Sequence, residues 1–355
     1  MIMGRIYLIK KQMKKIIYLS IFILIIFLLS GCSLARILNY EVTDPENIFR
    51  PKTEDLLRRK INGAEIKLAE NENLYPVAIM IENAADAWPL SGLDRADLVI
   101  EAITEASITR FVAIYANDKD IEKIGPVRSA RPYYLDWIEP FEPVYMHVGG
   151  APEALRLLAS GQYDLINLDQ FFNYQYYWRD NKWRYAPHNV YTSSELIQKA
   201  LTDKDLKEPA DYQMWQYKKD KDLDDRPEQV KDITLLYTND YYRVDWKYNR
   251  EENNYIRYQY NDIQQMTDGE WIKAKNIIVQ VNDMVILDNV GRKRITTIGE
   301  GQAWVFRDGE TIESRWVKEA EDKRTIYYDN NNNEIIFNGG ITWIQVIPDE
   351  DYLRY

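Results

Sequence analysis

The chain has little cysteine and little histidine. Among its 355 residues, Cys32 is the single cysteine, and His147 and His188 are the two histidines. A lone cysteine forms no disulfide within the chain, so the hydrophobic core must stabilise the fold. The histidines do not have the HxH or HxxxH spacing of a metal centre. We therefore expect neither a metal site nor another cofactor.

The sequence also lacks the motifs of nucleotide hydrolysis and triad catalysis, namely a Walker loop, a GxSxG elbow and a catalytic cysteine.

Positive charge is scarce as well. Residues 1–31 carry five basic and no acidic side chains, so the remaining chain has 40 Lys and Arg against 56 Asp and Glu, a net charge of −16. This excess argues against nucleic acid as a partner. Any anion that the protein binds must meet a local group of cations.

The long apolar run of the chain lies near the N-terminus. A basic segment at residues 10–15 precedes an apolar segment at residues 16–29, which is shorter than the roughly 20 residues of a membrane span and fits a signal peptide. The run ends in LSGC, closing at Cys32, and this resembles a bacterial lipobox. The resemblance implies cleavage before Cys32 and its modification by acyl chains such as palmitate. A short anchor helix with an incidental cysteine is the alternative, and both Met1 and Met13 are candidate starts.

Composition divides the chain into successive parts. We expect a signal peptide (1–31), a lipid-anchored tether (32–75), an α/β N-terminal domain (76–201), a charged linker (202–231), a mostly β C-terminal domain (232–348) and a tail (349–355). Two or more acyl chains anchor a protein stably. The expected location is therefore the outer face of the cell membrane.

The two domains differ in the pattern of their apolar residues. In the first, apolar runs such as PVAIMIE alternate with helical stretches such as APEALRLLASG, where Pro152 suits a first turn and Gly161 a C-terminal stop. In the second, aromatic and β-branched runs are separated by turn signals such as Asp308-Gly309. The sequence therefore predicts an α/β domain followed by a mostly β domain, α+β overall.

Several motifs in order resemble those of the YerB-type lipoproteins of Gram-positive bacteria. The N-terminal motifs are PVAIMIEN, IGPVRSARPYYLDW, HVGGAPEAL and APHNVYTS, and the C-terminal ones are GEGQAWVFRDGE and GGITWIQVIP. The resemblance runs from about Pro76 to Pro348 and includes the lipobox. It implies a lipid-anchored surface protein with two consecutive domains. The family is grouped under a domain of unknown function, number 3048, so the resemblance implies no established reaction.

Two arginines in the motif IGPVRSARPYYLDW are candidate anion ligands. Arg128 and Arg131 lie three residues apart between Pro126 and Pro132, and prolines restrict the backbone around them. If this segment is helical, the two guanidinium groups share one face and form a forked donor set for a carboxylate or phosphate. The alternative is internal pairing with Glu101, Glu105 or Asp136.

His147, His188 and Asn189 are further candidate ligand residues. His147 ends an expected strand just before two glycines, and His188 and Asn189 lie in APHNVYTS. Ligands in α/β folds bind at the carboxyl ends of strands. The alternative for each histidine is a half-buried ring that is hydrogen-bonded to the backbone.

Glu101 and Glu105 support an enzymatic alternative. They flank the turn after an expected strand, and two carboxylates at a suitable separation act as acid and base on a glycosidic bond. Acidic residues are abundant in this chain, so most of them must be solvated surface groups.

Residues 171–185 contain eight aromatic side chains. We expect an aromatic platform formed by Tyr176, Tyr177, Trp178 and Trp183, which stacks on sugar rings or contacts a partner protein. The alternative is that half of these rings fill the core beneath a long loop.

These features lead to a main functional prediction and two alternatives. The main one is a non-catalytic envelope protein that recognises an anionic cell-wall component or a partner protein. The first alternative is an enzyme that cleaves peptidoglycan with a glutamate as general acid. The second is a scaffold without a small-ligand site.

Overall fold

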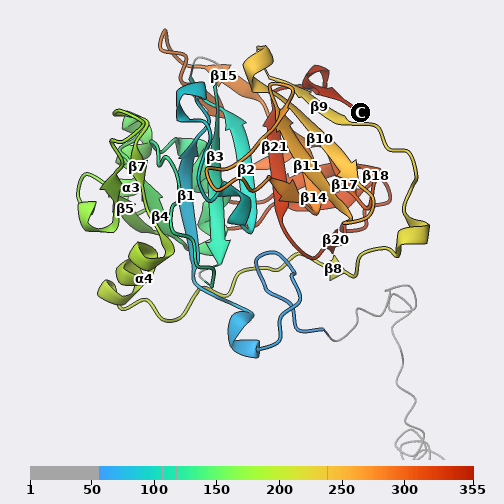
Figure 1. Cartoon of the computed structure of the whole chain (residues 1–355), viewed down its shortest axis with the longest axis horizontal. Helices are drawn as coiled ribbons and strands as arrows, with labels where there is room; N and C mark the ends of the chain where they lie inside the picture. Colours follow the sequence, from blue (N-terminus) through green and yellow to red (C-terminus); the bar gives the residue numbers. More distant parts are fainter. Residues whose placement is uncertain (1–55, 106–107, 117, 238) are drawn as a thin grey trace, which may run out of the picture. The chain divides into compact units, whose positions relative to one another are not determined.

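One large sheet crosses both halves of the chain (Figure 1). The computed structural model describes residues 56–105, 108–116, 118–237 and 239–355. Within them, ten strands pair in the order β19-β18-β17-β14-β21-β2-β3-β1-β4-β5. These strands are β1 (Pro76–Glu82), β2 (Leu98–Ile103), β3 (Thr109–Ala116), β4 (Val144–His147), β5 (Ile166–Asp169), β14 (Asn276–Val281), β17 (Gly299–Arg307), β18 (Glu310–Lys318), β19 (Ile326–Asp329) and β21 (Thr342–Ile347).

The two halves of this sheet join at β2 and β21. These strands are parallel and paired from Leu98 with Thr342 to Ala102 with Val346. β3 runs antiparallel to both β1 and β2, while β4 and β5 continue parallel to β1. The expected combination of an α/β N-terminal domain and a mostly β C-terminal domain is confirmed, and strands from both contribute to one continuous sheet.

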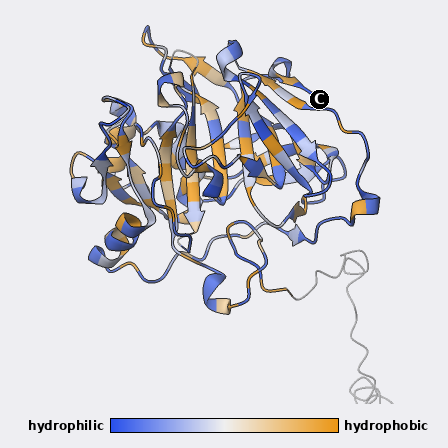
Figure 2. Cartoon of the chain, in the orientation of Figure 1, coloured by the Kyte–Doolittle hydropathy of each residue, from blue (hydrophilic) through white to orange (hydrophobic). Residues whose placement is uncertain are grey.

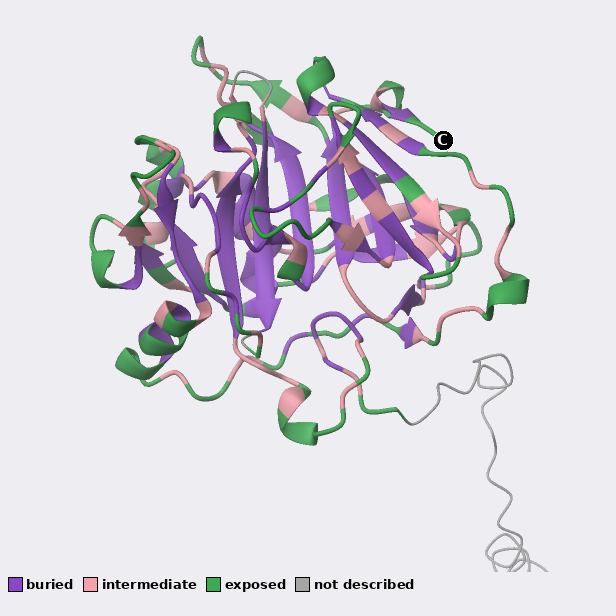
Figure 3. Ribbon diagram, in the orientation of Figure 1, coloured by how far each residue is buried: buried purple, intermediate pink, exposed green. Residues whose placement is uncertain are grey.

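The strands are apolar on both faces because both faces of the sheet are covered. On β1, Val77, Ile79 and Ile81 belong to one hydrophobic cluster, whereas Ala78 and Met80 belong to a second cluster on the other face. Successive side chains of a strand point to opposite faces, so a doubly covered strand is a continuous apolar run. Apolar residues accordingly concentrate on these strands (Figure 2), which are the buried part of the fold (Figure 3).

A smaller antiparallel sheet covers one face of the large sheet. Its strands are β9 (Ile233–Leu236), β10 (Arg243–Asn249), β11 (Asn254–Gln259), β12 (Asp262–Ile263), β13 (Lys273–Ala274) and β22 (Leu353–Arg354). The ring of Trp246 on β10 lies 5.2 Å from that of Trp343 on β21, so the two sheets share a core. The expected tail includes β22, which pairs with β9.

Within the described part of the chain, three α-helices pack on the faces of the large sheet. They are α2 (Pro132–Ile138), α3 (Pro152–Ser160) and α4 (Ser194–Asp203). As predicted, Pro152 occupies the first turn of α3, and Gly161 ends it with a φ of 71°. Ser193 caps α4 by accepting a hydrogen bond from the Leu196 amide at 3.3 Å.

Short elements connect these layers. The strand pairs are β6 (Trp178–Arg179) with β7 (Val190–Tyr191), β8 (Tyr217–Lys218) with β20 (Phe337–Asn338), and β15 (Met284–Ile286) with β16 (Lys293–Ile295). The 3-10 helices are η2 (Ala69–Asn71), η3 (Ala85–Ala87), η4 (Leu93–Arg95), η6 (Glu139–Phe141), η7 (Tyr174–Tyr176), η8 (Leu223–Asp225), η9 (Asp240–Tyr242) and η10 (Glu350–Tyr352).

Two segments that the sequence assigned to a tether and a linker are partly packed. Ile61, from the end of the expected tether, is buried in the second cluster together with Trp215 and Tyr217 from the expected linker. Gly63 lies against the Tyr217 ring so closely that a Cβ there would be 2.1 Å from it. Aromatic side chains therefore hold both segments on the fold, despite the charged residues around them.

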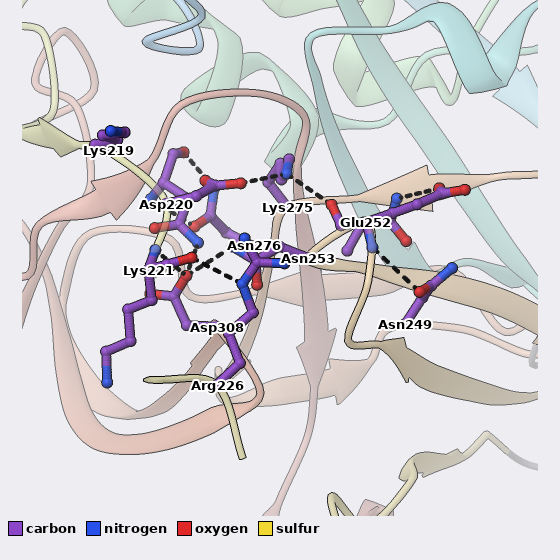
Figure 4. Close-up of polar contacts among 12 residues, drawn as sticks. Lys219, Asp220, Lys221, Arg226, Asn249, Glu252, Asn253, Lys275, Asn276 and Asp308 are labelled. Atoms are coloured by element: carbon purple, nitrogen blue, oxygen red, sulfur yellow. Dashed lines mark hydrogen bonds and ion pairs between the residues drawn. The ribbon is translucent and has the colours of Figure 1, made fainter. Parts of the chain in front are cut away.

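Asp308 joins the linker segment to the turn at Asn253 and to β20 (Figure 4). Its buried carboxylate accepts hydrogen bonds from Lys218 Nζ at 2.5 Å, Asn253 Nδ2 at 2.8 Å and Asn338 Nδ2 at 2.7 Å. Nearby, Lys275 Nζ pairs with Asp220 at 2.5 Å. Burial alone would raise the pKa of Asp308, but these hydrogen bonds lower it below the usual value. The carboxylate therefore stays ionised inside the fold.

A buried ion pair connects the two sheets. Glu101 on β2 and Arg257 on β11 have no exposed side-chain surface, and Arg257 Nη2 lies 3.0 and 2.9 Å from the two carboxylate oxygens. Trp343 Nε1 donates to the same carboxylate at 3.3 Å. The guanidinium also lies 5.3 Å from the Trp343 ring centre. Each charge thus has its only ionic partner, among the described residues, in the opposite sheet.

We predict that Glu101→Gln lowers the free energy of unfolding by about 3–5 kcal/mol, because it leaves the Arg257 charge buried without a counter-ion. Urea unfolding followed by tryptophan fluorescence measures the loss. Glu313→Gln, at an exposed position on β18, is the control and should change stability by less than about 0.5 kcal/mol. A loss below about 1 kcal/mol for Glu101→Gln contradicts a structural role for the pair.

We also predict that Asp308→Asn removes a stabilising contribution that depends on pH. Because the folded-state pKa of Asp308 is lowered from 3.8, its ionised form stabilises the fold above pH 3.8, and this contribution disappears as pH falls through the folded value. Asparagine tolerates the φ of 52° at this turn. The variant should be less stable by about 1.5–3 kcal/mol near neutral pH, with a difference that shrinks in acid. Unfolding curves across this pH range check it, and a constant difference contradicts it.

Candidate anion-binding site

A cavity of about 590 Å³ opens at one end of the N-terminal strands. Glu82 ends β1, Thr104 and Glu105 follow β2, and Gly150 follows β4, so the carboxyl ends of three strands that run in the same direction form its base. The first two residues of the antiparallel β3, Thr109 and Arg110, complete this base. Carboxyl ends of strands are the usual ligand position in α/β folds.

Arginine and histidine side chains line much of this cavity. Arg128, Arg131 and His188, all predicted as ligand residues, are present, together with Arg110 and Arg292. The conditional prediction that Arg128 and Arg131 share a helix face is wrong, because α2 begins only at Pro132 and Arg131 has an extended backbone. The two arginines still reach one cavity, since the extended segment runs along its wall.

Four of these five side chains have a carboxylate partner within the fold. Glu82 contacts Arg128 Nε at 3.0 Å through one oxygen and His188 Nδ1 at 3.0 Å through the other. Glu105 accepts from Arg131 Nε at 2.6 Å and Nη2 at 2.5 Å. The alternative of internal pairing, with Glu105 among the expected partners, is thus confirmed for Arg131.

Arg292 comes from the C-terminal half of the chain. Its Nε lies 3.3 Å from Asp288, four residues earlier in the same hairpin. The cavity is therefore lined by residues from both halves. No spacing in the sequence relates position 292 to positions 128 and 131, so Arg292 could not be predicted as a cavity residue.

Arg110 is the exception. Its side chain is 7% exposed, and Nη1 donates to the Ser129 carbonyl at 2.9 Å. Among the described residues no carboxylate forms an ion pair with it, because the nearby Glu105 is bound to Arg131. Burial and the positive charges of Arg131 and Arg128 together lower the pKa of Arg110 to about 10. The cavity therefore contains one buried arginine that has no ion-pair partner among the described residues.

Glu105 is poorly suited to donate a proton. Burial would raise its pKa, but the hydrogen bonds and the charge of Arg131 lower it below the usual value. A general acid needs a raised pKa to hold its proton near neutral pH. Glu101 lies outside the cavity in the buried pair with Arg257. The predicted role of Glu101 as a catalytic acid therefore does not fit its position.

His147 and Asn189 lie outside the cavity as well. His147 is fully buried: Nδ1 contacts the Gly149 carbonyl at 2.8 Å and Nε2 contacts Asn167 Oδ1 at 2.7 Å. Asn189 accepts from Arg179 Nη1 at 2.8 Å and is also buried. His147 is bonded to the Gly149 carbonyl and Asn189 to the side chains of Arg179 and Asn181, so neither predicted ligand residue reaches this cavity.

The expected aromatic platform has a different composition in the structure. Tyr176 and Tyr177 are buried, and Trp178 is half-buried against Tyr191, so they belong to the core side of the loop. Trp183 is 87% exposed as predicted. The other exposed rings of this segment were not singled out from the sequence. We call the exposed set the aromatic surface; it consists of Phe171, Phe172, Tyr174, Trp183 and Tyr185.

The aromatic surface is connected to the cavity through the backbone. Arg184 donates to the Pro89 carbonyl at 2.6 Å and to Tyr191 Oη at 2.8 Å, which fixes the segment between the exposed rings of Trp183 and Tyr185. The segment then reaches His188, which lines the cavity. In the sequence, an aromatic run without a period of 2 or 3.6 gave no indication of which rings are exposed.

Cys32, the predicted lipidation site, lies outside the described residues. Within those residues, no helix is long and apolar enough to cross a membrane. In the same part of the chain, no group of three or more His, Cys, Asp or Glu side chains is arranged to hold a metal ion.

A curated protein and a solved structure, both described as YerB of Bacillus subtilis, are similar to most of the chain. A protein of Bacillus subtilis (strain 168), named "Putative lipoprotein YerB", is 32% identical over 327 residues, which is 90% of this chain and 95% of that protein. The crystal structure of the YerB protein from Bacillus subtilis matches with a TM-score of 0.74 at 28% identity, covering 84% of this chain and 99% of that one.

Family models match both halves of the chain. The model for the N-terminal domain of a protein of unknown function, DUF3048, matches residues 63–207, and the model for its C-terminal domain matches residues 232–344. These ranges include the cavity residues Arg110, Arg128 and Arg292. The resemblance seen in the sequence, to YerB and to this family, is therefore confirmed, and the chain belongs to the DUF3048 family of proteins of unknown function.

Proposed function

We propose that this protein is a non-catalytic envelope protein that binds an anionic cell-wall component in the cavity around Arg110. The ligand group that fits is a carboxylate or phosphate. Peptidoglycan carries carboxylates on its sugar-linked peptides and is the wall component that a protein tethered to the membrane meets. The LSGC sequence at Cys32 and the lipoprotein name of the relative support the tethered location.

The proposal rests on Arg110, a buried arginine whose charge has no ion-pair partner among the described residues. A buried cation without a counter-ion costs free energy in the unliganded protein, and an anion that enters the cavity removes this cost. The neighbouring Arg128 and Arg131 already have partners in Glu82 and Glu105. Arg128 and Arg131 therefore position the site and contribute to its positive potential. The guanidinium of Arg110 supplies the N–H donors for a bound anion.

The aromatic surface gives a second reason to expect a glycan. Its five exposed rings lie on the segment that leads to His188 at the cavity wall. Aromatic faces stack on the apolar faces of sugars, and a large exposed aromatic patch on a soluble domain marks a binding surface. A ligand with both sugar rings and carboxylates would contact both the aromatic surface and the cavity.

The alternative of peptidoglycan cleavage has weaker support. It needs a protonated glutamate at the bond that breaks, and Glu101 is buried in an ion pair while Arg131 keeps Glu105 ionised. Two carboxyls with a raised pKa, Glu139 at about 7 and Asp94 at about 6, lie outside this cavity. The experiment below nevertheless distinguishes binding to the cell wall from cleavage of the cell wall.

We predict that Arg110→Gln weakens retention on purified cell-wall sacculi about tenfold or more, the loss expected for one charge-assisted contact. The same change should leave the melting temperature unchanged or raise it, because it removes an uncompensated buried charge. A chain of residues 33–355 is suitable, since it contains the whole compact unit from Glu54 to Tyr355. Co-sedimentation, released muropeptides and thermal unfolding are measured on the same samples.

Three further variants make the result specific. Arg131→Gln should lower the melting temperature, because it breaks the pair with Glu105. Arg156→Gln, on an exposed part of α3 outside the cavity, should change neither quantity. Unchanged retention for Arg110→Gln contradicts binding at this cavity. Muropeptide release that disappears in Glu105→Gln would instead identify a wall-cleaving enzyme.

A further inference from the structure

The hairpin of β15 and β16 exposes an unusual number of apolar side chains. It runs from Met284 to Ile295 and belongs to neither of the two main sheets. At its tip, Ile286 is 68% and Val290 62% exposed, and Val285 and Leu287 are exposed as well. The hairpin projects beyond the sheets in Figure 1. We call these four side chains the apolar tip.

The base of the hairpin is held firmly. Ile295 is buried in the second hydrophobic cluster, and Met284 packs against that cluster. Lys293 Nζ donates to the Thr104 carbonyl after β2 at 2.6 Å, and the Asp283 carbonyl accepts from the Thr296 amide at 2.9 Å. The apolar tip is therefore not a loose loop that collapses onto the core; the anchored base keeps it exposed.

The turn at the tip satisfies its own backbone. Leu287 N donates to the Arg292 carbonyl at 2.8 Å, and Gly291 N donates to the Asp288 carbonyl at 3.0 Å. Asp288 Oδ1 accepts from the amides of Val290 at 3.0 Å and Arg292 at 3.2 Å. These four bonded amides lower the cost of bringing the turn to a membrane interface, because unsatisfied backbone groups oppose entry into an apolar medium.

Positive charge follows the apolar tip directly. Arg292, Lys293 and Arg294 are consecutive, and Arg294 is exposed without an ion pair among the described residues. Asp288 and Asp283 are the acidic residues of the hairpin region. This local excess contrasts with the net charge of −16 after residue 31. Apolar side chains beside basic ones are the pattern of elements that bind anionic membrane surfaces.

We propose that this hairpin contacts the membrane, with the apolar tip in the interfacial region of the bilayer and Arg294 at anionic headgroups. The inference is separate from ligand binding in the cavity. An attached membrane is within reach, because residues 33–55 between the expected lipidation site and the described unit span at most about 80 Å. The contact adds a second, reversible attachment and fixes which face of the protein the membrane meets.

Environment-sensitive fluorescence tests the contact. A chain of residues 33–355 has no cysteine, so Ile286→Cys introduces a single site for an NBD label. Leu223→Cys, at an exposed apolar position on η8, is the matched control. With vesicles of phosphatidylcholine and phosphatidylglycerol, the label at position 286 should brighten and shift to the blue, while the label at 223 should not. An unresponsive label at 286 overturns the proposal.

Unlabelled variants test the same surface by vesicle sedimentation. The double variant Ile286→Ser and Leu287→Ser, whose sites lie outside the cavity lining, should reduce partition onto these vesicles by about tenfold or more. Leu223→Ser should not. Arg294→Gln should reduce partition by about fivefold on anionic vesicles and leave partition on pure phosphatidylcholine unchanged. Equal partition of the double variant and the parent overturns the proposal.

Two outcomes keep this inference distinct from the proposed function. Retention on sacculi should be the same in the double variant and the parent, so a failure of wall binding leaves the membrane test intact. A dimer that depends on Ile286 and Leu287, in a protein that does not bind vesicles, would assign the apolar tip to a second copy of the chain and overturn membrane contact.

Discussion

The buried pair of Glu101 and Arg257 is the constraint on which the arrangement of the two sheets depends. Neither charge has another ionic partner among the described residues, and both are removed from water. A displacement of one sheet over the other would separate them at a large cost, because a buried charge without a counter-ion is strongly destabilising. The pair therefore holds β11 of the smaller sheet against β2 of the large sheet. Beside β2, the parallel pairing with β21 joins the C-terminal half of the chain to the same sheet.

The cavity lies between two exposed elements that come from different halves of the chain. The segment with the aromatic surface leads to His188 on one side, and the hairpin with the apolar tip contributes Val290 and Arg292. Within the cavity, paired arginines surround Arg110, which has no carboxylate partner among the described residues. A counter-ion beside Arg110 would increase stability, whereas binding of an external anion requires that this counter-ion be absent. The fold keeps an uncompensated charge there and relies on its large buried cores for stability.

Local patterns in the sequence were sufficient for the strands, for the ends of α3 and for three cavity residues. Pro152 and Gly161 act within a few residues of their position, and Arg128, Arg131 and His188 belong to two short motifs, IGPVRSARPYYLDW and APHNVYTS. The contribution of Arg292 depends on packing between halves of the chain, which no local pattern encodes. His147 ends a strand as predicted, but its ring points into the core. Tyr176 and Tyr177 lie in the expected aromatic run, and their rings are buried as well. A local sequence pattern predicts a helix or strand more readily than it predicts which side chains of that helix or strand are exposed to solvent.

The place of β21 in the sheet affects the order in which the molecule can form. β21 lies between β2 and β14, although its residues, Thr342–Ile347, are the last of the ten strands along the chain. While the protein is being made, β2 has an open edge that stays without its partner until nearly the last residue has emerged. An open strand edge is a template for association with other chains. The large sheet is thus complete only after Ile347 has been made, and a product interrupted before Thr342 retains an exposed edge that marks it for aggregation or removal.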